Sequence, residues 1–193
     1  MPDPSSANDA ADLERFAALL QEAVPVLLAW AHCRLRGPLR QRLDVEDLVQ
    51  EIGMRACLRR ADYDPARGTF VQWLLGFANR VWLETLRALG RDPCGPMQRR
   101  GGDSVVQDVL DTVTTVTRRA ARGEAASACR DRIDQLDEQD RMLLLAIGIE
   151  NLGHAEASAM LGIGEDACRK RWQRLRATLQ GDPVLRQFAA ERG

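Results

Sequence analysis

The sequence is short of the residues that metal sites and nucleophilic catalysis need. It has two histidines, and its five cysteines are scattered, with no Cys-x-x-Cys pair. Metal sites gather such ligands at close spacing, so we expect no metal and no cofactor. An odd number of scattered cysteines favours reduced thiols over a disulfide framework. Asp44, Asp47 and Glu51 form an acidic cluster, but no histidine or phosphate-binding loop accompanies it, so we expect no enzymatic activity.

The sequence also lacks a long uninterrupted hydrophobic run. The longest runs, 24–31 and 142–149, fall short of the roughly 18 residues that span a bilayer. The polar, acidic N-terminus has neither the basic nor the apolar stretch of a secretory signal. We therefore expect a cytoplasmic protein with no membrane partner. At 193 residues and 45% hydrophobic content, the chain can form two small globular domains.

Helical periodicity dominates the sequence and no stretch alternates as a strand, which predicts an all-α fold. Two helical blocks, 10–90 and 124–180, form the predicted domains. Residues 91–123 are rich in glycine, proline and charge, so we predict a flexible linker there that carries at most a transient helix. The predicted helices span 10–24, 26–36, 44–60 and 69–90 in the first block, and 124–135, 138–149, 154–161 and 165–180 in the second.

Individual residues mark where some of these helices begin. Pro25 suits the first turn of a new helix, because its missing N–H does least harm there. Asp44 and Thr69 are typical N-caps, and Gln72 stands where the partner of Thr69 in a capping box would stand.

The last predicted helix, 165–180, has the pattern of a DNA-reading helix after a glycine-containing turn. Residues 167–180 carry five basic and no acidic side chains, whereas residues 124–166 carry ten acidic and three basic ones. A solvated amphipathic helix is the alternative, but its outer face would normally mix both signs. We therefore predict a helix-turn-helix that binds DNA. Its predicted buried stripe is Cys168, Trp172, Leu175 and Leu179, and its predicted DNA contacts are Arg169, Lys170, Arg171, Gln173 and Arg174.

The predicted helix 44–60 has an unusual outer face. Apolar side chains lie there among acids and an amide, which is typical of a protein-docking surface. Alternatively, Met54 and Leu58 pack beneath the first helices. The predicted core face is Val45, Leu48, Val49, Ile52 and Ala56, and the predicted outer face is Asp47, Gln50, Glu51, Met54 and Leu58.

Four segments of the chain form a recognisable set, at 44–51 (Asp-Val-Glu-Asp-Leu-Val-Gln-Glu), 63–74, 136–145 and 161–165. In sequence, order and spacing they resemble bacterial RNA polymerase sigma factors of the extracytoplasmic-function type. The resemblance implies that residues 10–90 are a region 2-like domain for the polymerase clamp and the minus-ten element. It implies that residues 124–180 are a region 4-like domain for the polymerase flap and the minus-thirty-five element. The implied polymerase contacts are Asp44, Asp47, Gln50, Glu51 and Met54.

The loop 61–69 and the helix 69–90 match the part of the family that holds the melted minus-ten strand. Aromatic, amide and guanidinium groups suit this task, because stacking contributes roughly 1 to 3 kcal/mol per base. The family often reads Ala-Arg-Asn where this chain has 78-Ala-Asn-Arg-80, so we carry over strand contact there but no base specificity. Core packing is the alternative for Trp73, and it is our prediction for Trp82. The implied minus-ten contacts are Arg67, Trp73, Asn79, Arg80 and Arg87.

The resemblance thus implies a promoter-specificity subunit without enzymatic activity, whose partners are core RNA polymerase and both duplex and melted promoter DNA. The alternative is a helix-turn-helix repressor or activator with no role as a polymerase subunit, which would leave the surface of helix 44–60 without a function. An anti-sigma protein is a candidate regulator. The chain is not itself such an inhibitor of the zinc-binding kind, because it lacks their His-x-x-x-Cys-x-x-Cys motif.

Overall fold

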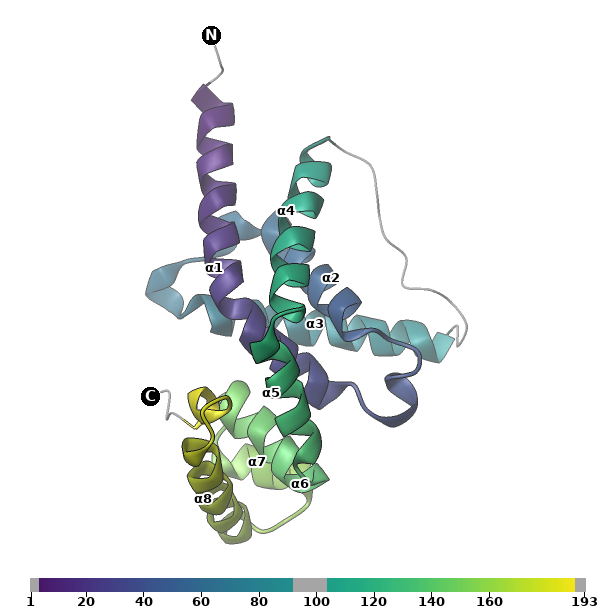
Figure 1. Cartoon of the computed structure of the whole chain (residues 1–193), viewed down its shortest axis with the longest axis vertical. Coiled ribbons are helices and arrows are strands. Elements are labelled where there is room, and N and C mark those ends of the chain that lie inside the picture. The colour runs from purple at the N-terminus through teal and green to yellow at the C-terminus, as the bar shows by residue number, and fades with distance from the viewer. Residues whose placement is uncertain (1–3, 92–103, 190–193) are drawn as a thin grey trace. The chain divides into compact units, whose positions relative to one another are not determined.

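The computed structural model describes residues 4–91 and 104–189, which are helical apart from the loops and turns between helices (Figure 1). No strand occurs in these described ranges, so the all-α prediction is confirmed. The chain divides into two compact units. Unit 1 comprises Met1–Leu27 and Leu43–Ala121, and unit 2 comprises Leu28–Arg42 and Arg122–Gly193.

Unit 1 is built on four helices. They are the first part of α1 (Pro4–Arg34), α2 (Val45–Leu58), α3 (Phe70–Arg91) and α4 (Ser104–Ala121). Leu20, Leu48, Ile52 and Leu74 are almost fully buried and form the centre of its core. The predicted caps are confirmed. Asp44 accepts hydrogen bonds from the N–H groups of Glu46 and Asp47, at 2.7 and 3.2 Å.

The capping box at the start of α3 is confirmed as well. The Gln72 N–H donates to the Thr69 hydroxyl at 3.3 Å, and the Thr69 N–H donates to the Gln72 side chain at 3.0 Å. These bonds satisfy backbone donors that the first turn of a helix leaves open, so they set where α3 begins.

The prediction that Pro25 starts a new helix is wrong, because α1 runs through it without interruption. Proline inside a helix costs about 3 kcal/mol. Val24, Val26 and Leu27 are nearly fully buried on either side, and each such burial contributes about 1.5 to 3 kcal/mol. Burial therefore outweighs the lost hydrogen bond, and the ring of Pro25 faces solvent.

Residues Ala11–Arg34 of α1 are long and apolar enough to cross a membrane by length and composition, with a mean hydropathy of 1.4. The prediction from uninterrupted apolar runs missed this stretch. Isolated polar residues interrupt its apolar runs but lower its mean hydropathy only slightly. Most of the stretch is buried within the protein, as in the core helix of a soluble fold.

Helix α4 lies in the range predicted as a linker and packs against α2 (Figure 1). Val113 and Thr117 of α4 are buried, and the Thr117 hydroxyl donates to the Val113 carbonyl at 2.8 Å. Residues Ser104–Ala121 therefore form a packed helix and not the expected flexible linker. Their apolar residues recur at helical spacing and pack against α2. Residues 92–103 lie outside the described residues.

Unit 2 contains the end of α1, α5 (Glu124–Gln135), α6 (Glu138–Leu143), α7 (His154–Leu161) and α8 (Glu165–Gly181). A π-helical segment, Leu144–Ile149, continues α6, so the predicted helix 138–149 changes its hydrogen-bonding pattern midway. The core includes Trp30, Leu35, Ile133, Leu144 and Phe188, all nearly inaccessible to solvent. Residues of the C-terminal turn, Arg186–Phe188, thus complete this core. Cys33, Cys57, Cys129 and Cys168 are free thiols, and Cys94 lies outside the described residues.

Candidate nucleic-acid interface

Helices α7 and α8 form the predicted helix-turn-helix. Gly162 ends α7 in the left-handed conformation, with φ of 66°, which a residue without a side chain adopts at no steric cost. Its N–H donates to the Ala159 carbonyl at 3.3 Å. Gly164 then precedes the first turn of α8 in an extended conformation. Gly162 therefore lets the chain turn between α7 and α8, whereas the extended conformation of Gly164 is open to any residue.

Helix α8 has the predicted two faces. Its buried residues are Cys168, Trp172, Leu175 and Leu179, as the periodicity predicts. Lys170, Gln173 and Arg174 are exposed. Arg169 is also exposed and forms ion pairs with Glu165 at 2.8 Å and Asp166 at 3.6 Å. Such exposed pairs contribute at most about 1 kcal/mol, so a phosphate group can replace them.

Arg171 has a different environment from its neighbours on α8. Its guanidinium donates to Asp140 at 2.5 Å and to Gln139 at 2.7 Å. It also pairs with Asp137 at 2.5 Å. Hydrogen bonding to Asp140 raises the pKa of Arg171. The structure thus gives this predicted DNA contact an internal role, because it ties α8 to the start of α6.

Asp137 completes this junction as the N-cap of α6. It accepts a hydrogen bond from the Asp140 N–H at 2.8 Å. This backbone bond, with a smaller contribution from the charge of Arg171, holds the pKa of Asp137 below its usual range. The sequence signal for this junction was the pair of acidic residues, Asp137 and Asp140, at the start of a helix, since such a pair can bind an arginine. Sequence reasoning missed their pairing with Arg171.

The first turns of α3 carry an aromatic cluster. The Trp73 ring centroid lies 5.5 Å from that of Tyr63 and 4.8 Å from that of Phe77. Trp73 is only half-buried, so part of its ring faces solvent, whereas Trp82 is 6% exposed and belongs to the core as predicted. Arg67 is exposed on the short turn Pro65–Arg67, directly before this cluster.

Further along α3, an exposed stripe combines charge with an apolar side chain. Arg80 and Arg87 are exposed two turns apart, and Leu83 between them is 49% exposed. Asn79 is half-buried beside the stripe. Cationic groups with an accessible apolar surface suit unstacked bases and their phosphates. Sequence reasoning placed Leu83 away from the apolar bulk but did not include it among the contacts.

The outer face of α2 is partly engaged by other parts of unit 1. Gln50 donates to the Thr114 hydroxyl of α4 at 2.5 Å. Glu51 accepts from Arg55 at 2.6 Å, and Arg55 also pairs with Glu84 of α3. Asp44 and Asp47 are exposed near the start of the helix.

One stripe of α2 remains accessible. It consists of Asp47, half-buried Met54 and Leu58, which is 51% exposed. These residues lie at helical spacing on one side of α2. The structure thus brings Asp47 and Met54 together with Leu58 on this stripe. Gln50 and Glu51 form hydrogen bonds within unit 1.

Comparison with known families gives two matches of one kind along the chain. The family model of Sigma-70 region 2 matches residues 19–92, and that of Sigma-70, region 4 matches residues 128–179. The chain is similar to "Probable RNA polymerase sigma factor RfaY" of Xanthomonas campestris pv. campestris, with 26% identity over 149 residues. That alignment covers 77% of this chain but only 36% of the relative, so the chain spans about a third of its length. No solved structure matches the chain.

Proposed function

Because the chain belongs to the RNA polymerase sigma factors of the extracytoplasmic-function type, we propose that it is a promoter-specificity subunit. It binds core RNA polymerase, recognises promoter DNA and helps to open it. The observation that carries the proposal is the presence of both regions, in order, each with an exposed surface of the right chemistry. Sigma factor families are not enzymes, and the chain performs no catalysis of its own in this role.

In this proposal α8 enters the major groove of the minus-thirty-five element. Lys170, Gln173 and Arg174 supply a cation, an amide and a guanidinium on its exposed face. A guanidinium can contact a guanine edge through two hydrogen bonds, which gives about 1 to 3 kcal/mol of base discrimination. Arg169 exchanges Glu165 and Asp166 for a phosphate group when DNA binds.

The surface of α3 holds the melted minus-ten strand. Bases leave the duplex stack and regain stacking energy on the exposed part of Trp73, while Arg67, Arg80 and Arg87 neutralise phosphates. Asn79 lies beside these arginines and offers both a donor and an acceptor.

The outer face of α2 docks on the polymerase clamp. Asp47 and Asp44 supply negative charge, and Met54 and Leu58 supply apolar surface. Charge guides the encounter, whereas burial of apolar surface slows dissociation. An anti-sigma protein would compete for this face. The protein works in the cytoplasm, where the polymerase and the chromosome are.

The test is in vitro transcription with purified core polymerase on a genomic DNA library. We expect the full chain to bind core polymerase and to produce transcripts from a limited set of start sites. Asp47→Arg should abolish both activities, whereas Arg174→Ala should leave polymerase binding intact and reduce promoter use. A chain that binds DNA but not core polymerase would overturn the proposal and leave a repressor or activator.

A further inference from the structure

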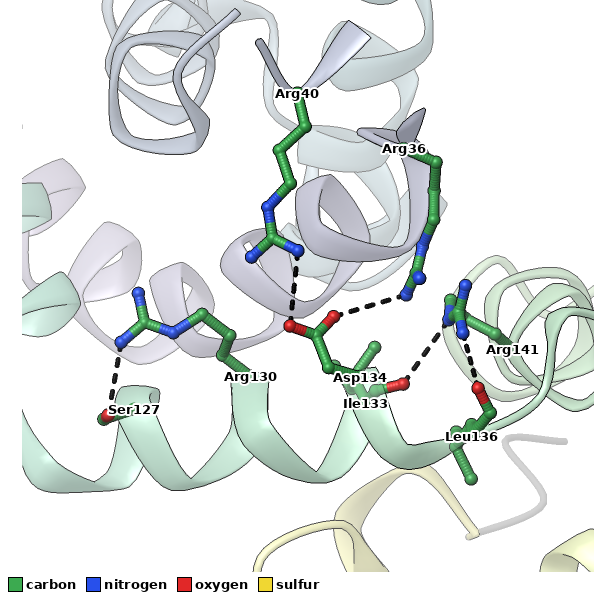
Figure 2. A network of polar contacts seen from close by, with 8 residues as sticks. All are labelled: Arg36, Arg40, Ser127, Arg130, Ile133, Asp134, Leu136 and Arg141. Atoms are coloured by element: carbon green, nitrogen blue, oxygen red, sulfur yellow. Dashed lines mark hydrogen bonds and ion pairs between the residues drawn. The ribbon is translucent and has the colours of Figure 1, made fainter. Parts of the chain in front are cut away.

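Three arginines of unit 2 gather around one carboxylate. Arg36 and Arg40, from the segment after α1, pair with different oxygens of Asp134 at 3.4 and 3.3 Å (Figure 2). Arg130 lies one turn before Asp134 on α5 and donates to the Ser127 hydroxyl at 3.2 Å. We call Arg36, Arg40 and Arg130 the arginine cluster.

Asp134 uses only part of what the arginine cluster offers. Arg36 and Arg40 each give it one nitrogen, at a distance longer than the roughly 2.7 to 2.9 Å of a strong charge-assisted bond. The buried Nε of Arg36 has no hydrogen-bond partner among the described residues. A guanidinium binds a carboxylate or a phosphate best through two parallel hydrogen bonds. The cluster therefore keeps N–H donors for another acceptor.

Positive charge is in excess around this carboxylate. Arg141 is 7% exposed and donates to the carbonyls of Ile133 and Leu136, so it adds a charge without an acid (Figure 2). Burial, followed by repulsion from Arg141, lowers the pKa of Arg36. In the described parts of the chain, Asp134 is the one acid that pairs with the arginine cluster. A bound anion would relieve this repulsion and so stabilise the folded unit.

His32 lies beside the same charges. Burial, and then the charges of Arg130 and Arg40, lower its pKa to about 4, whereas Asp134 acts in the opposite direction. Charges act strongly on an imidazole only at short range, so Arg130 belongs to the same site as Arg40. At neutral pH the imidazole is uncharged and can donate one hydrogen bond to a ligand.

We propose that the arginine cluster binds a diphosphate group, either free or carried by a nucleotide. The two phosphates carry more than one negative charge and can accept bonds from guanidinium groups of two different elements at once. The ligand takes the place of Asp134 at Arg36 and Arg40. No residue of the proposed DNA and polymerase surfaces belongs to the cluster, so this site goes beyond the proposed function.

The arrangement of the cluster favours a small anion over a nucleic-acid backbone. Backbone phosphates carry one charge each and follow one another along a strand, so the cations that bind them are spread along a surface. Arg36 and Arg40 instead meet at the two oxygens of a single side chain. The cations are therefore placed for one compact anion of high charge.

The experiment titrates inorganic pyrophosphate into the full chain, by calorimetry at constant ionic strength. We expect Arg40→Gln and Arg130→Gln each to weaken pyrophosphate binding by about tenfold or more, because each removes a charge-assisted hydrogen bond. Arg132→Gln is the matched control, since it removes the same charge from α5, where Arg132 pairs with Asp182 at 3.3 Å. It should change the affinity by less than about twofold.

Asp134→Asn separates binding from structural damage. Asp134 competes with the ligand for two guanidinium groups, so its neutralisation should tighten pyrophosphate binding by about three- to tenfold. A substitution that merely damaged unit 2 would weaken binding. Asp131→Asn removes an exposed acid from the same helix and should have a smaller effect. Unchanged or weaker binding in Asp134→Asn would overturn the proposal.

Two further measurements identify the site and the ligand. The chain has two histidines, and pyrophosphate should shift the imidazole NMR signals of His32 more than those of His154. Equal affinity for pyrophosphate and a nucleoside diphosphate would identify the diphosphate group as the ligand. Tighter binding of the nucleoside diphosphate, lost in Arg40→Gln, would identify a nucleotide.

Three outcomes would reject the diphosphate site. The first is that neither pyrophosphate nor the nucleoside diphosphate binds. The second is that Arg132→Gln weakens binding as much as Arg40→Gln, because the effect would then follow from overall charge. The third is that Arg40→Gln and Arg130→Gln weaken binding to a DNA duplex without a minus-thirty-five element but leave pyrophosphate binding unchanged. The cluster would then be a contact for the DNA backbone.

Discussion

Gly53 of α2 lies directly against Val113 of α4. A Cβ atom at residue 53 would lie 2.9 Å from the Val113 Cγ1, closer than real Cβ contacts allow. Val113 is fully buried, and its branched side chain has little freedom to move. The missing side chain at residue 53 therefore sets how closely α4 can approach α2.

We expect Gly53→Ala to lower the free energy of unfolding of unit 1 by about 1 kcal/mol or more, because overpacking outweighs the gain in helix propensity. Gly76→Ala is the control. Gly76 also lies inside a helix, and a Cβ atom there would meet nothing within 4 Å. It should stabilise by about 0.5 to 1 kcal/mol. Urea denaturation of both variants checks the opposite signs. Equal effects would mean that α4 does not pack against Gly53 in solution.

A fragment that ends before α4 should be less stable than one that includes it. Residues 1–95 expose the α2 surface that Val113 and Thr117 cover, whereas residues 1–121 keep it buried. We expect the longer fragment to have the higher urea midpoint, and both to bind core polymerase if folded. If the two fragments had the same stability, α4 would contribute nothing to unit 1.

The two faces of α8 and the caps of α2 and α3 were predictable from the sequence, because they depend on neighbours within one or two turns. The role of Arg171 was not, since its partner Asp140 lies 31 residues earlier in the chain. The packing of α4 depends on a glycine in another helix. The assignment of residues 28–42 to unit 2 depends on Trp30 and Glu150, which are 120 residues apart. Periodicity carries no information about such pairings.

Arg171→Ala and Lys170→Ala change adjacent residues of α8 but should have different effects. The first should lower stability, and the second should weaken DNA binding. Loss of Arg171 leaves Asp137 and Asp140 without their cation, so we expect a loss of about 1 to 2 kcal/mol in the free energy of unfolding. Lys170 is exposed, and its loss should change stability by less than about 0.5 kcal/mol. Lys170→Ala should weaken binding to all duplexes and reduce the salt slope by about one. Denaturation curves and salt titrations of DNA binding measure these effects, and the reverse pattern would contradict the assignment.

Asp47→Arg tests the docking surface of α2. Reversing an exposed charge inside a docking face removes an attraction and adds a repulsion, so core polymerase binding should be lost while the circular dichroism spectrum is unchanged. Gln50→Ala should differ, because Gln50 donates to Thr114 and its loss also loosens α4. Thr114→Val is the matched comparison, since it breaks the same bond from the other side without touching α2. If Thr114→Val reduced polymerase binding as much as Asp47→Arg, the effect would come from α4 and not from the α2 face.

The stability of unit 2 should fall in mild acid because of His32. Burial, reinforced by the charges of Arg130 and Arg40, lowers the pKa of His32 from 6.5 to about 4, although Asp134 acts in the opposite direction. Between these values the unfolded chain binds a proton that the folded chain does not, so the free energy of unfolding decreases as pH falls from about 6.5 towards 4.

We expect His32→Gln to flatten this dependence in urea denaturation at a series of pH values. His32 and Cys33 are neighbours in residues 28–42, which pack in unit 2, so the rate of Cys33 alkylation, corrected for the thiolate fraction of a model thiol, should also rise in this window in the wild-type chain and not in His32→Gln. A wild-type stability that stays constant from pH 6.5 to 4.5 would show that His32 titrates normally. In that case the protonated imidazole of His32 would have to be solvated beside Arg36, Arg40, Arg130 and Asp134. It would have to do so without loosening the packing of residues 28–42.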